Sequence, residues 1–208
     1  MPKESNPVYE PQVLDFTRAV KDYCMLLEKT DTYELKMWLN KINAVLPDLY
    51  LHAVHLPILS PAFEELNQHS ITEEDYETVR KKMLAKLGEF DAFEEVFNPD
   101  RIEVENAVGE SISENLTDIY QDVKDFLLLF EDGSYEVMYE AIWEVQQTFE
   151  QYWGQKLVNT LRAVHYLNYS ETDIEETDYK PEENINFNDI DTSNWIISRR
   201  QEDFRNDE

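Results

Sequence analysis

Two stretches with a heptad-like apolar pattern determine the fold class of this 208-residue chain. Between residues 110 and 131, apolar side chains return at alternating spacings of four and three, at Ile112, Leu116, Ile119, Val123, Phe126 and Phe130. This spacing is typical of a helix that buries one face against other helices. After the turn EDGS the pattern continues at Met138, Ile142, Val145, Phe149 and Tyr152. Two long helices of this kind predict an all-α fold, an antiparallel helical bundle.

The second apolar pattern changes phase near Gly154. Leu157, Leu161 and Val164 resume the pattern, displaced by about one residue from the positions that precede the glycine. We expect Gly154 to mark a bend in this helix or a close contact with another helix.

Further helices are expected at 11–28, 32–56 and 72–87, which brings the bundle to five or six helices. Pro47 should kink the second of these or divide it in two, because proline removes a backbone donor and clashes with the preceding turn. Thr72 and Asp75 match a capping box, and Gly88 is a suitable stop. Residues 89–109 lack periodicity, so we predict an irregular segment that is either a short extended piece or a long connection.

The chain is predicted to form a single helical domain, 11–167, followed by an acidic tail, 168–208. The tail has too few clustered apolar residues to build a core, and we expect it to be flexible or peripheral. One segment of it, 194–200, places apolar side chains next to basic ones: Trp195, Ile196, Ile197, Arg199 and Arg200. This segment can dock on the body, which we favour, or bind a partner.

The charge of the chain restricts its partners. The 45 acidic and 18 basic residues give a net charge of -27, which repels phosphates and anionic lipids. We therefore expect no direct binding of nucleic acid and no membrane contact, and we favour a basic partner protein. The N-terminus lacks the apolar region of a secretory signal, and the single Cys24 cannot form an intramolecular disulfide. Both observations indicate the cytoplasm.

Four strings resemble a bacterial family of small, acidic, all-helical proteins that is classed as a domain of unknown function. They are SISENLTDIYQDVKDF, FEQYWGQKLVNTLRAVHYL, LPDLYLHAVHLP and ITEEDYETVRKKMLAKLG. The resemblance spans roughly residues 13–167 and implies an all-helical fold. It implies no activity, so no functional residue is carried over from the family.

Glu114, Asp118 and Asp122 lie four residues apart in the strongest helical stretch. Steps of 100° per residue place Glu114, Asp118 and Asp125 opposite the apolar face, and Asp122 at its boundary. Like charges at this spacing cost only about 0.2 to 0.5 kcal/mol per pair. We interpret the group as a solvated acidic face, with a site for a cation or a basic peptide as the alternative.

The last helical stretch carries several polar and aromatic side chains that could line a groove. Stripes of this kind usually belong to a core, but a groove here would face the acidic helix. The binding residues predicted on this ground are Asp118, Tyr120, Asp122, Tyr152, Asn159, Arg162 and His165. A pair formed by Arg162 and Asp122 could orient a polar ligand or a partner.

Metal and catalytic motifs are weak in this sequence. His52 and His55 have metal-like spacing, but a zinc or iron centre needs further ligands, so we favour a surface or core pair. Glu74 and Glu77 match the first half of a magnesium motif found in all-helical nucleotide pyrophosphatases, without the second half. The sequence contains no phosphate loop and no nucleophile elbow. We predict no catalytic residue, no metal and no cofactor.

The leading functional hypothesis is a cytosolic helical module for protein interaction or regulation, with an acidic surface that meets a basic partner. The first alternative is a metal-dependent or small-ligand enzyme that uses the carboxylates from Glu114 to Asp122 with His52, His55 or His165. A second is nucleic-acid mimicry, in which a rigid acidic surface occupies a DNA- or RNA-binding protein.

Overall fold

A computed structural model describes residues 6–63, 70–95 and 108–170 of the chain. Within these residues there are six α-helices and one two-stranded sheet. The long elements are α1 (Pro11–Glu28), α2 (Leu35–Ala53), α3 (Glu73–Leu87), α4 (Ile112–Asp132), α5 (Tyr135–Thr148) and α6 (Gly154–Tyr169). Short helical turns are η1 (Pro7–Tyr9), η2 (Thr30–Thr32), η3 (Gly88–Phe90) and the π-helical η4 (Phe149–Trp153). The predicted all-α bundle is confirmed.

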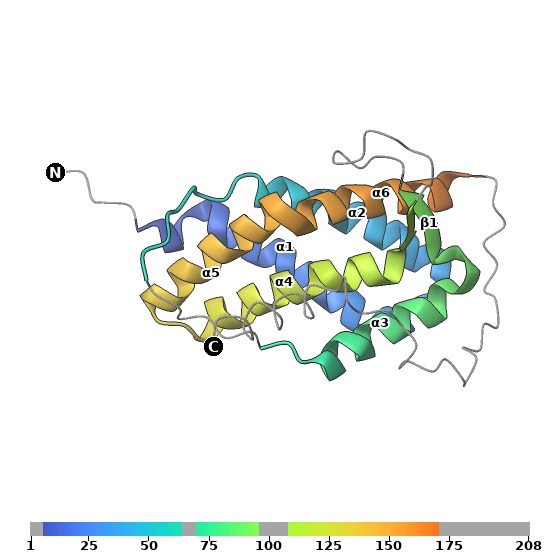
Figure 1. The fold of residues 1–208 in the computed structure, drawn as a ribbon, viewed down its shortest axis with the longest axis horizontal. Coiled ribbons are helices and arrows are strands. Elements are labelled where there is room, and N and C mark those ends of the chain that lie inside the picture. The colour runs from blue at the N-terminus through green and yellow to red at the C-terminus, as the bar shows by residue number, and fades with distance from the viewer. Residues whose placement is uncertain (1–5, 64–69, 96–107, 171–208) are drawn as a thin grey trace.

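Helix α4 lies in the middle of the bundle (Figure 1). It packs against α1, α3, α5 and α6, while α2 packs against α1 and α6. The apolar pattern of α4 is buried as predicted, and the interior also holds the large side chains of Phe16, Tyr23, Trp38 and Trp153. Because neighbours surround α4, polar side chains such as Asp118 and Asp125 are also enclosed, and this determines the chemistry of the site described below.

Helices α5 and α6 form one rod, joined by the π-helical turn η4. A π turn holds one residue more than an α turn, which accounts for the phase change read from the sequence. At Gly154 a Cβ atom would lie 2.5 Å from the carbonyl oxygen of Phe149 and 2.9 Å from its ring. The close contact expected at Gly154 is therefore present, but it is made with the preceding turn of the same rod rather than with another helix.

Helix α2 runs through Pro47 without interruption. The predicted division into two consecutive helices is wrong. Leu39, Ile42, Leu46 and Leu49 are fully buried on the inner side of α2, whereas Pro47 is exposed. Packing on the inner side holds the helix together, and the missing backbone donor is confined to the face that water reaches.

A short antiparallel hairpin precedes α4 and consists of β1 (Ala92–Glu95) and β2 (Val108–Ser111). It stands at the end of the bundle where α6 also ends (Figure 1). The extended piece considered for 89–109 is thus present at both ends of that segment, while residues 96–107 lie outside the described part of the chain. The capping box of α3 is confirmed, since Asp75 N–H donates to Thr72 Oγ1 and Thr72 N–H donates to Asp75 Oδ2.

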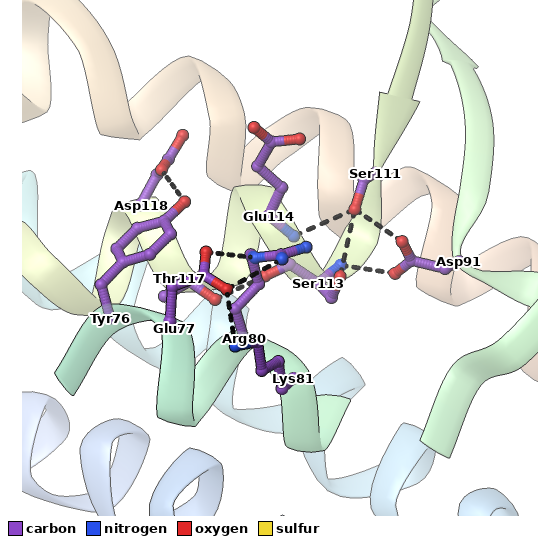
Figure 2. A network of polar contacts seen from close by, with 10 residues as sticks. All are labelled: Tyr76, Glu77, Arg80, Lys81, Asp91, Ser111, Ser113, Glu114, Thr117 and Asp118. Atoms are coloured by element: carbon purple, nitrogen blue, oxygen red, sulfur yellow. Dashed lines mark hydrogen bonds and ion pairs between the residues drawn. The ribbon is translucent and has the colours of Figure 1, made fainter. Parts of the chain in front are cut away.

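Asp91 fixes the hairpin to the N-terminus of α4 (Figure 2). Its Oδ1 accepts the N–H of Ser113 at 2.7 Å, and its Oδ2 accepts the hydroxyl of Ser111 at 2.6 Å. Ser111 in turn caps the helix, because its Oγ accepts the N–H of Glu114. The buried carboxylate therefore satisfies a donor of the first turn of α4 and orients the hairpin above it.

The tail from residue 171 onward lies outside the described residues, and with it the segment that contains Trp195, Ile196, Arg199 and Arg200. The predicted domain boundary at 167 stays a prediction; α6 itself continues to Tyr169. In the part of the chain that the structure describes, no helix combines the length and apolar character needed to cross a membrane.

Candidate functional site

Asp118 stands at the centre of a polar cluster on α4. Its Oδ1 accepts the hydroxyl of Tyr76 at 2.7 Å. Its Oδ2 accepts the hydroxyl of Tyr152 at 2.7 Å and lies 2.7 Å from Nζ of Lys156. The Asp118 side chain is only 17% exposed. Both carboxylate oxygens are thus engaged by donors from α3, η4 and α6, and we call these four residues the Asp118 cluster.

The elements that carry these donors explain how they converge on Asp118. Tyr76 lies in the first turns of α3, directly after the capping box, and Figure 2 shows its hydroxyl pointing at the carboxylate. Tyr152 belongs to the π turn, and Lys156 follows four residues later on the same face. Lys156 Nζ lies 5.1 Å from the centre of the Tyr152 ring and also donates to Oδ1 of the buried Asn115. The α5–α6 rod therefore places the hydroxyl of Tyr152 and the ammonium of Lys156 next to each other at Asp118.

Burial dominates the electrostatics of the cluster. Burial, reinforced by the nearby Asp118 carboxylate, raises the pKa of Tyr76 and of Tyr152 well above the usual tyrosine value, so both hydroxyls stay protonated and donate. Glu114 lies one turn before Asp118. Burial, and then repulsion by Asp118, raises the pKa of Glu114 above its ordinary value, while Lys156 opposes the change. Ionisation of Glu114 beside the Asp118 cluster is therefore less favourable than ionisation of a free glutamate.

The interpretation of Glu114, Asp118 and Asp122 as a solvated face is wrong, because all three side chains are half-buried. Asp125, which the same count placed on the outer side, is buried as well. Asp125 is 6% exposed, and its Oδ1 accepts the backbone N–H groups of Ser70 and Ile71 at 2.7 and 3.0 Å. The angular count located the side of α4 opposite its apolar seam, but it could not identify the elements that cover that side. Helix α3, the residues before it and the α5–α6 rod cover it.

The other predicted binding residues are spread over the bundle. Tyr120 donates to Oε1 of Glu28 at 3.0 Å, on the side of α4 that faces α1. Asp122 lines a narrow cleft between α4 and α5 together with Asp125 and Glu144. Asn159 accepts from Gln155, and the ring of His165 packs 4.7 Å from that of Tyr169. Of the predicted set, the structure joins Asp118 with Tyr152.

Arg162 lies at the hairpin end of α6 and donates through Nη2 to the backbone oxygen of Glu94 at 2.7 Å. Lys156 meets Asp118, and Arg162 lines a pocket with Ile112, so α4 and α6 run in opposite directions. Asp122 therefore lies on the far side of Asp118 from Arg162. The predicted pairing of Arg162 with Asp122 is wrong.

The histidine pair and the pyrophosphatase-like glutamates serve local contacts. Nε2 of His52 lies 3.4 Å from Asp48, whereas His55 lies past the end of α2 with Nδ1 2.6 Å from the Leu51 oxygen. Glu77 forms a two-pronged contact with Arg80 at 2.9 and 3.0 Å (Figure 2). Among the described residues, no group of three or more His, Cys, Asp or Glu side chains is arranged to hold a metal ion.

An open groove of about 520 Å³ lies between η3, β1 and the last turns of α6. Its walls are apolar and consist of Phe90, Ala92, Phe93, Ile112, Ala163 and Leu167, while Glu89, Glu94, Arg162 and Tyr166 complete the lining. We call it the hairpin groove. Concave apolar sites with a few polar groups are typical binding sites.

Sequence reasoning identified Arg162 but missed the rest of the hairpin groove. Phe90 and Phe93 lie in the segment without helical periodicity, which gave them no predicted face. The signal that could have found them is the concentration of aromatic residues in EFDAFEEVF, which is unusual for a simple connection.

A family model described as "Domain of unknown function (DUF5063)" matches residues 7–170. The crystal structure of protein BF1032 from Bacteroides fragilis is similar to this chain, with 33% sequence identity and a TM-score of 0.71. The similarity covers 80% of this chain and 98% of that one, so the relative consists almost entirely of the shared fold. No curated protein significantly matches the sequence.

Proposed function

The chain belongs to the DUF5063 family, whose function is unknown, and we propose that it is a protein-interaction module that binds a basic segment of a partner protein in the hairpin groove. The proposal includes the cytoplasm of a bacterium as its place of action. The observation that carries it is the open apolar groove with two glutamates in its lining.

The shape and chemistry of the hairpin groove fit a short peptide segment with an apolar anchor. Phe90 and Phe93, which are half-buried, offer walls for an aromatic or aliphatic side chain. Tyr166 is 66% exposed and can pack over such an anchor once it is seated. Interfaces of this kind gain most of their affinity from a few anchors that enter a pocket.

The charge of the groove lining favours basic residues next to the apolar anchor of that segment. Glu89 and Glu94 lie in the groove lining, and the single guanidinium there, that of Arg162, donates to a backbone oxygen. The net charge of -27 adds a field that attracts cationic partners and speeds encounter. A partner segment that carries arginine or lysine beside its apolar anchor therefore suits the groove best.

The bundle enzyme and the nucleic-acid mimic draw on fewer observations. An enzyme at the Asp118 cluster would need an accessible carboxylate, whereas both oxygens of Asp118 are engaged by protein donors. Mimicry rests on overall charge, which a soluble surface can carry for solubility alone.

The proposal is tested by selecting a phage-displayed library of random dodecapeptides on the full chain. We expect enriched peptides to combine an aromatic or aliphatic anchor with arginine or lysine, and their affinity to fall with added salt. Ala92→Arg places a long cation in the hairpin groove. It should lower the affinity for synthetic copies of the enriched peptides at least tenfold. Calorimetric titration of each variant gives these affinities.

The matched control is Ala44→Arg. Ala44 is exposed like Ala92 and lines a second groove of about 460 Å³ between α1 and α2. We expect this variant to bind the selected peptides as the unmodified chain does. Enrichment of acidic peptides, or equal effects of the two substitutions, would contradict the proposed function.

A further inference from the structure

The hairpin groove adjoins the point at which α6 ends, and its chemistry matches one segment of the tail. We propose that the resting occupant of the groove is the chain's own segment 194–200, which a partner must displace. The inference rests on the proposed function, because it assumes that the groove binds apolar segments with basic flanks. It adds the regulation of that site and names the competing ligand.

Segment 194–200 combines apolar and basic residues. Trp195, Ile196 and Ile197 form an apolar run, and Arg199 and Arg200 follow after one serine. Elsewhere in the tail the sequence is mainly acidic and polar, so this is its one site where two adjacent arginines follow an apolar run. An apolar anchor with two guanidinium groups is the chemistry inferred above for the partner.

The apolar and basic residues of the segment complement the lining of the hairpin groove. The apolar run faces a lining that includes Phe90, Phe93 and Leu167, and burial of a tryptophan there removes a large apolar surface from water. The arginines meet the carboxylates of Glu89 and Glu94, which can accept two hydrogen bonds from one guanidinium. The second groove has a comparable set of charges, Asp22, Asp48 and Lys41, but Tyr33 is the single aromatic side chain in its lining. It is therefore a poorer match for a tryptophan than the hairpin groove, which Phe90, Phe93 and Tyr166 line.

The chain between α6 and the segment is long enough for the segment to reach the groove. Tyr166 and Leu167 line the groove only a few residues before Ser170, a distance of less than about 10 Å along the helix. About 24 residues separate Ser170 from Asn194. Flexible chains of that length span about 25 to 30 Å on average, which is enough to return to the groove from Ser170.

Tethering makes the contact effective even when its intrinsic affinity is modest. A linker of this kind holds its end at an effective concentration on the order of 1 mM. A segment that binds with a Kd of tens of micromolar would then occupy the groove most of the time. A free peptide must compete with it, and its apparent affinity for the full chain falls at least tenfold.

The test uses a fluorescein-labelled synthetic peptide with the sequence of residues 191–203, DTSNWIISRRQED. Its fluorescence anisotropy is titrated with the full chain and with the full-length triple variant W195A/I196A/I197A. We expect the triple variant to bind the peptide at least tenfold more tightly, because its own segment no longer competes. Adding Ala92→Arg to the triple variant should weaken binding at least tenfold, and adding Ala44→Arg should not.

Each other outcome overturns the inference. Equal binding by the full chain and the triple variant means that the segment does not occupy the groove in the chain. Binding that a scrambled peptide reproduces, or that Ala92→Arg and Ala44→Arg change equally, places the contact elsewhere. If the tail peptide does not bind while library-selected peptides still bind in a way that Ala92→Arg abolishes, the inference fails and the proposed function stands. If neither kind of peptide binds, both fail.

Discussion

The Asp118 cluster and the hairpin groove lie along the same pair of helices, α4 and α6, yet they are built in opposite ways. In the cluster, charged and polar side chains from four elements, α3, α4, η4 and α6, turn inward and engage one another. In the groove, apolar side chains line an open space and the polar groups stand beside them. About six residues of α4 separate Ile112 in the groove from Asp118, a rise of about 9 Å.

The difference assigns separate tasks to the two regions. A carboxylate inside a bundle is tolerated only when donors satisfy it, so the cluster fixes the relative positions of α3, α4 and α6. Part of the apolar lining of the groove, at Phe90, Ala92 and Phe93, keeps exposed surface. This surface adds little to the stability of the free chain, but it gains free energy when a ligand covers it. Substitutions in the cluster should therefore change unfolding, and those in the groove should change binding.

Replacement of Asp118 should have the largest effect on stability. Asp118→Asn keeps the shape but presents an amide to donors from Tyr76, Tyr152 and Lys156, and it leaves the Lys156 charge unpaired. We expect the free energy of unfolding to fall by about 2 to 4 kcal/mol, toward the lower value because the cluster is partly exposed. Urea unfolding followed by circular dichroism measures it.

Asp15→Asn is the matched control for that change, because Asp15 is an exposed acid on α1. It should alter the free energy of unfolding by no more than about 0.5 kcal/mol. If Asp118→Asn behaved in the same way, the cluster would not stabilise the bundle, and its carboxylate would have to be considered available to a ligand.

Gly154→Ala should have the next largest effect, because it acts on the turn that presents Tyr152. The added methyl would lie 2.5 Å from the Phe149 carbonyl oxygen, so the backbone of the π turn must shift. We expect a loss of about 1 to 3 kcal/mol in spite of the better helix propensity of alanine. Thermal unfolding measures it, with the exposed neighbour Gln155→Ala as a control that stays within about 0.5 kcal/mol.

A pair of tyrosine substitutions compares the two regions directly. Tyr152→Phe removes one hydrogen bond to a charged acceptor and should lower the free energy of unfolding by about 1 to 2 kcal/mol. Tyr166→Phe removes an exposed hydroxyl and should leave it within about 0.5 kcal/mol. Urea unfolding of both variants decides this.

In peptide binding we expect the opposite order, with an effect from Tyr166 and none from Tyr152. Tyr166→Ala should weaken groove-binding peptides severalfold, whereas Tyr152→Phe and Tyr169→Ala should not, although Tyr169 is 67% exposed on the same helix. Calorimetric titration with the library-selected peptides measures this. A loss of peptide affinity in Tyr152→Phe would show that the cluster contributes to recognition.

Local signals in the sequence were sufficient for most of the helices. The apolar seam that contains Leu116 and Val123 predicted the inner side of α4, and the capping box at Thr72 predicted the start of α3. The phase change near Gly154 predicted a bend or a close helix contact, and the structure has a π turn directly before this residue. These signals are local because helix periodicity and capping involve residues only a few positions apart.

The covering of α4 and the walls of the groove could not be predicted in the same way. Whether Asp118 and Asp125 face water depends on which elements pack against the outer side of α4, and that is a long-range property. The groove depends on Phe90 and Phe93, which reach α6 through a hairpin that has no helical period. Arg162 was identified, but its position relative to Asp122 required the antiparallel course of α4 and α6.

Substitution of Glu114 should have the smallest effect, and it tests the balance of charge beside the Asp118 cluster. Its pKa is raised, mainly by burial and then by Asp118, so the folded state binds this proton more tightly than the unfolded state. That contribution to stability is fully present below the pKa of the unfolded chain and is lost as the pH rises through the folded value.

Glu114→Gln removes the charge that burial disfavours. It should therefore be more stable than the unmodified chain at pH 7.5, by no more than about 1 kcal/mol, and this gain should shrink as the pH is lowered to 5. Both values lie above the sequence pI of about 4.3, where the chain keeps its negative charge. Urea unfolding at the two pH values measures the gain, and the exposed Glu150→Gln should show no such dependence. A gain that grows as the pH falls would mean that the folded chain stabilises the Glu114 carboxylate, so that Glu114 and Asp118 are both readily ionised there.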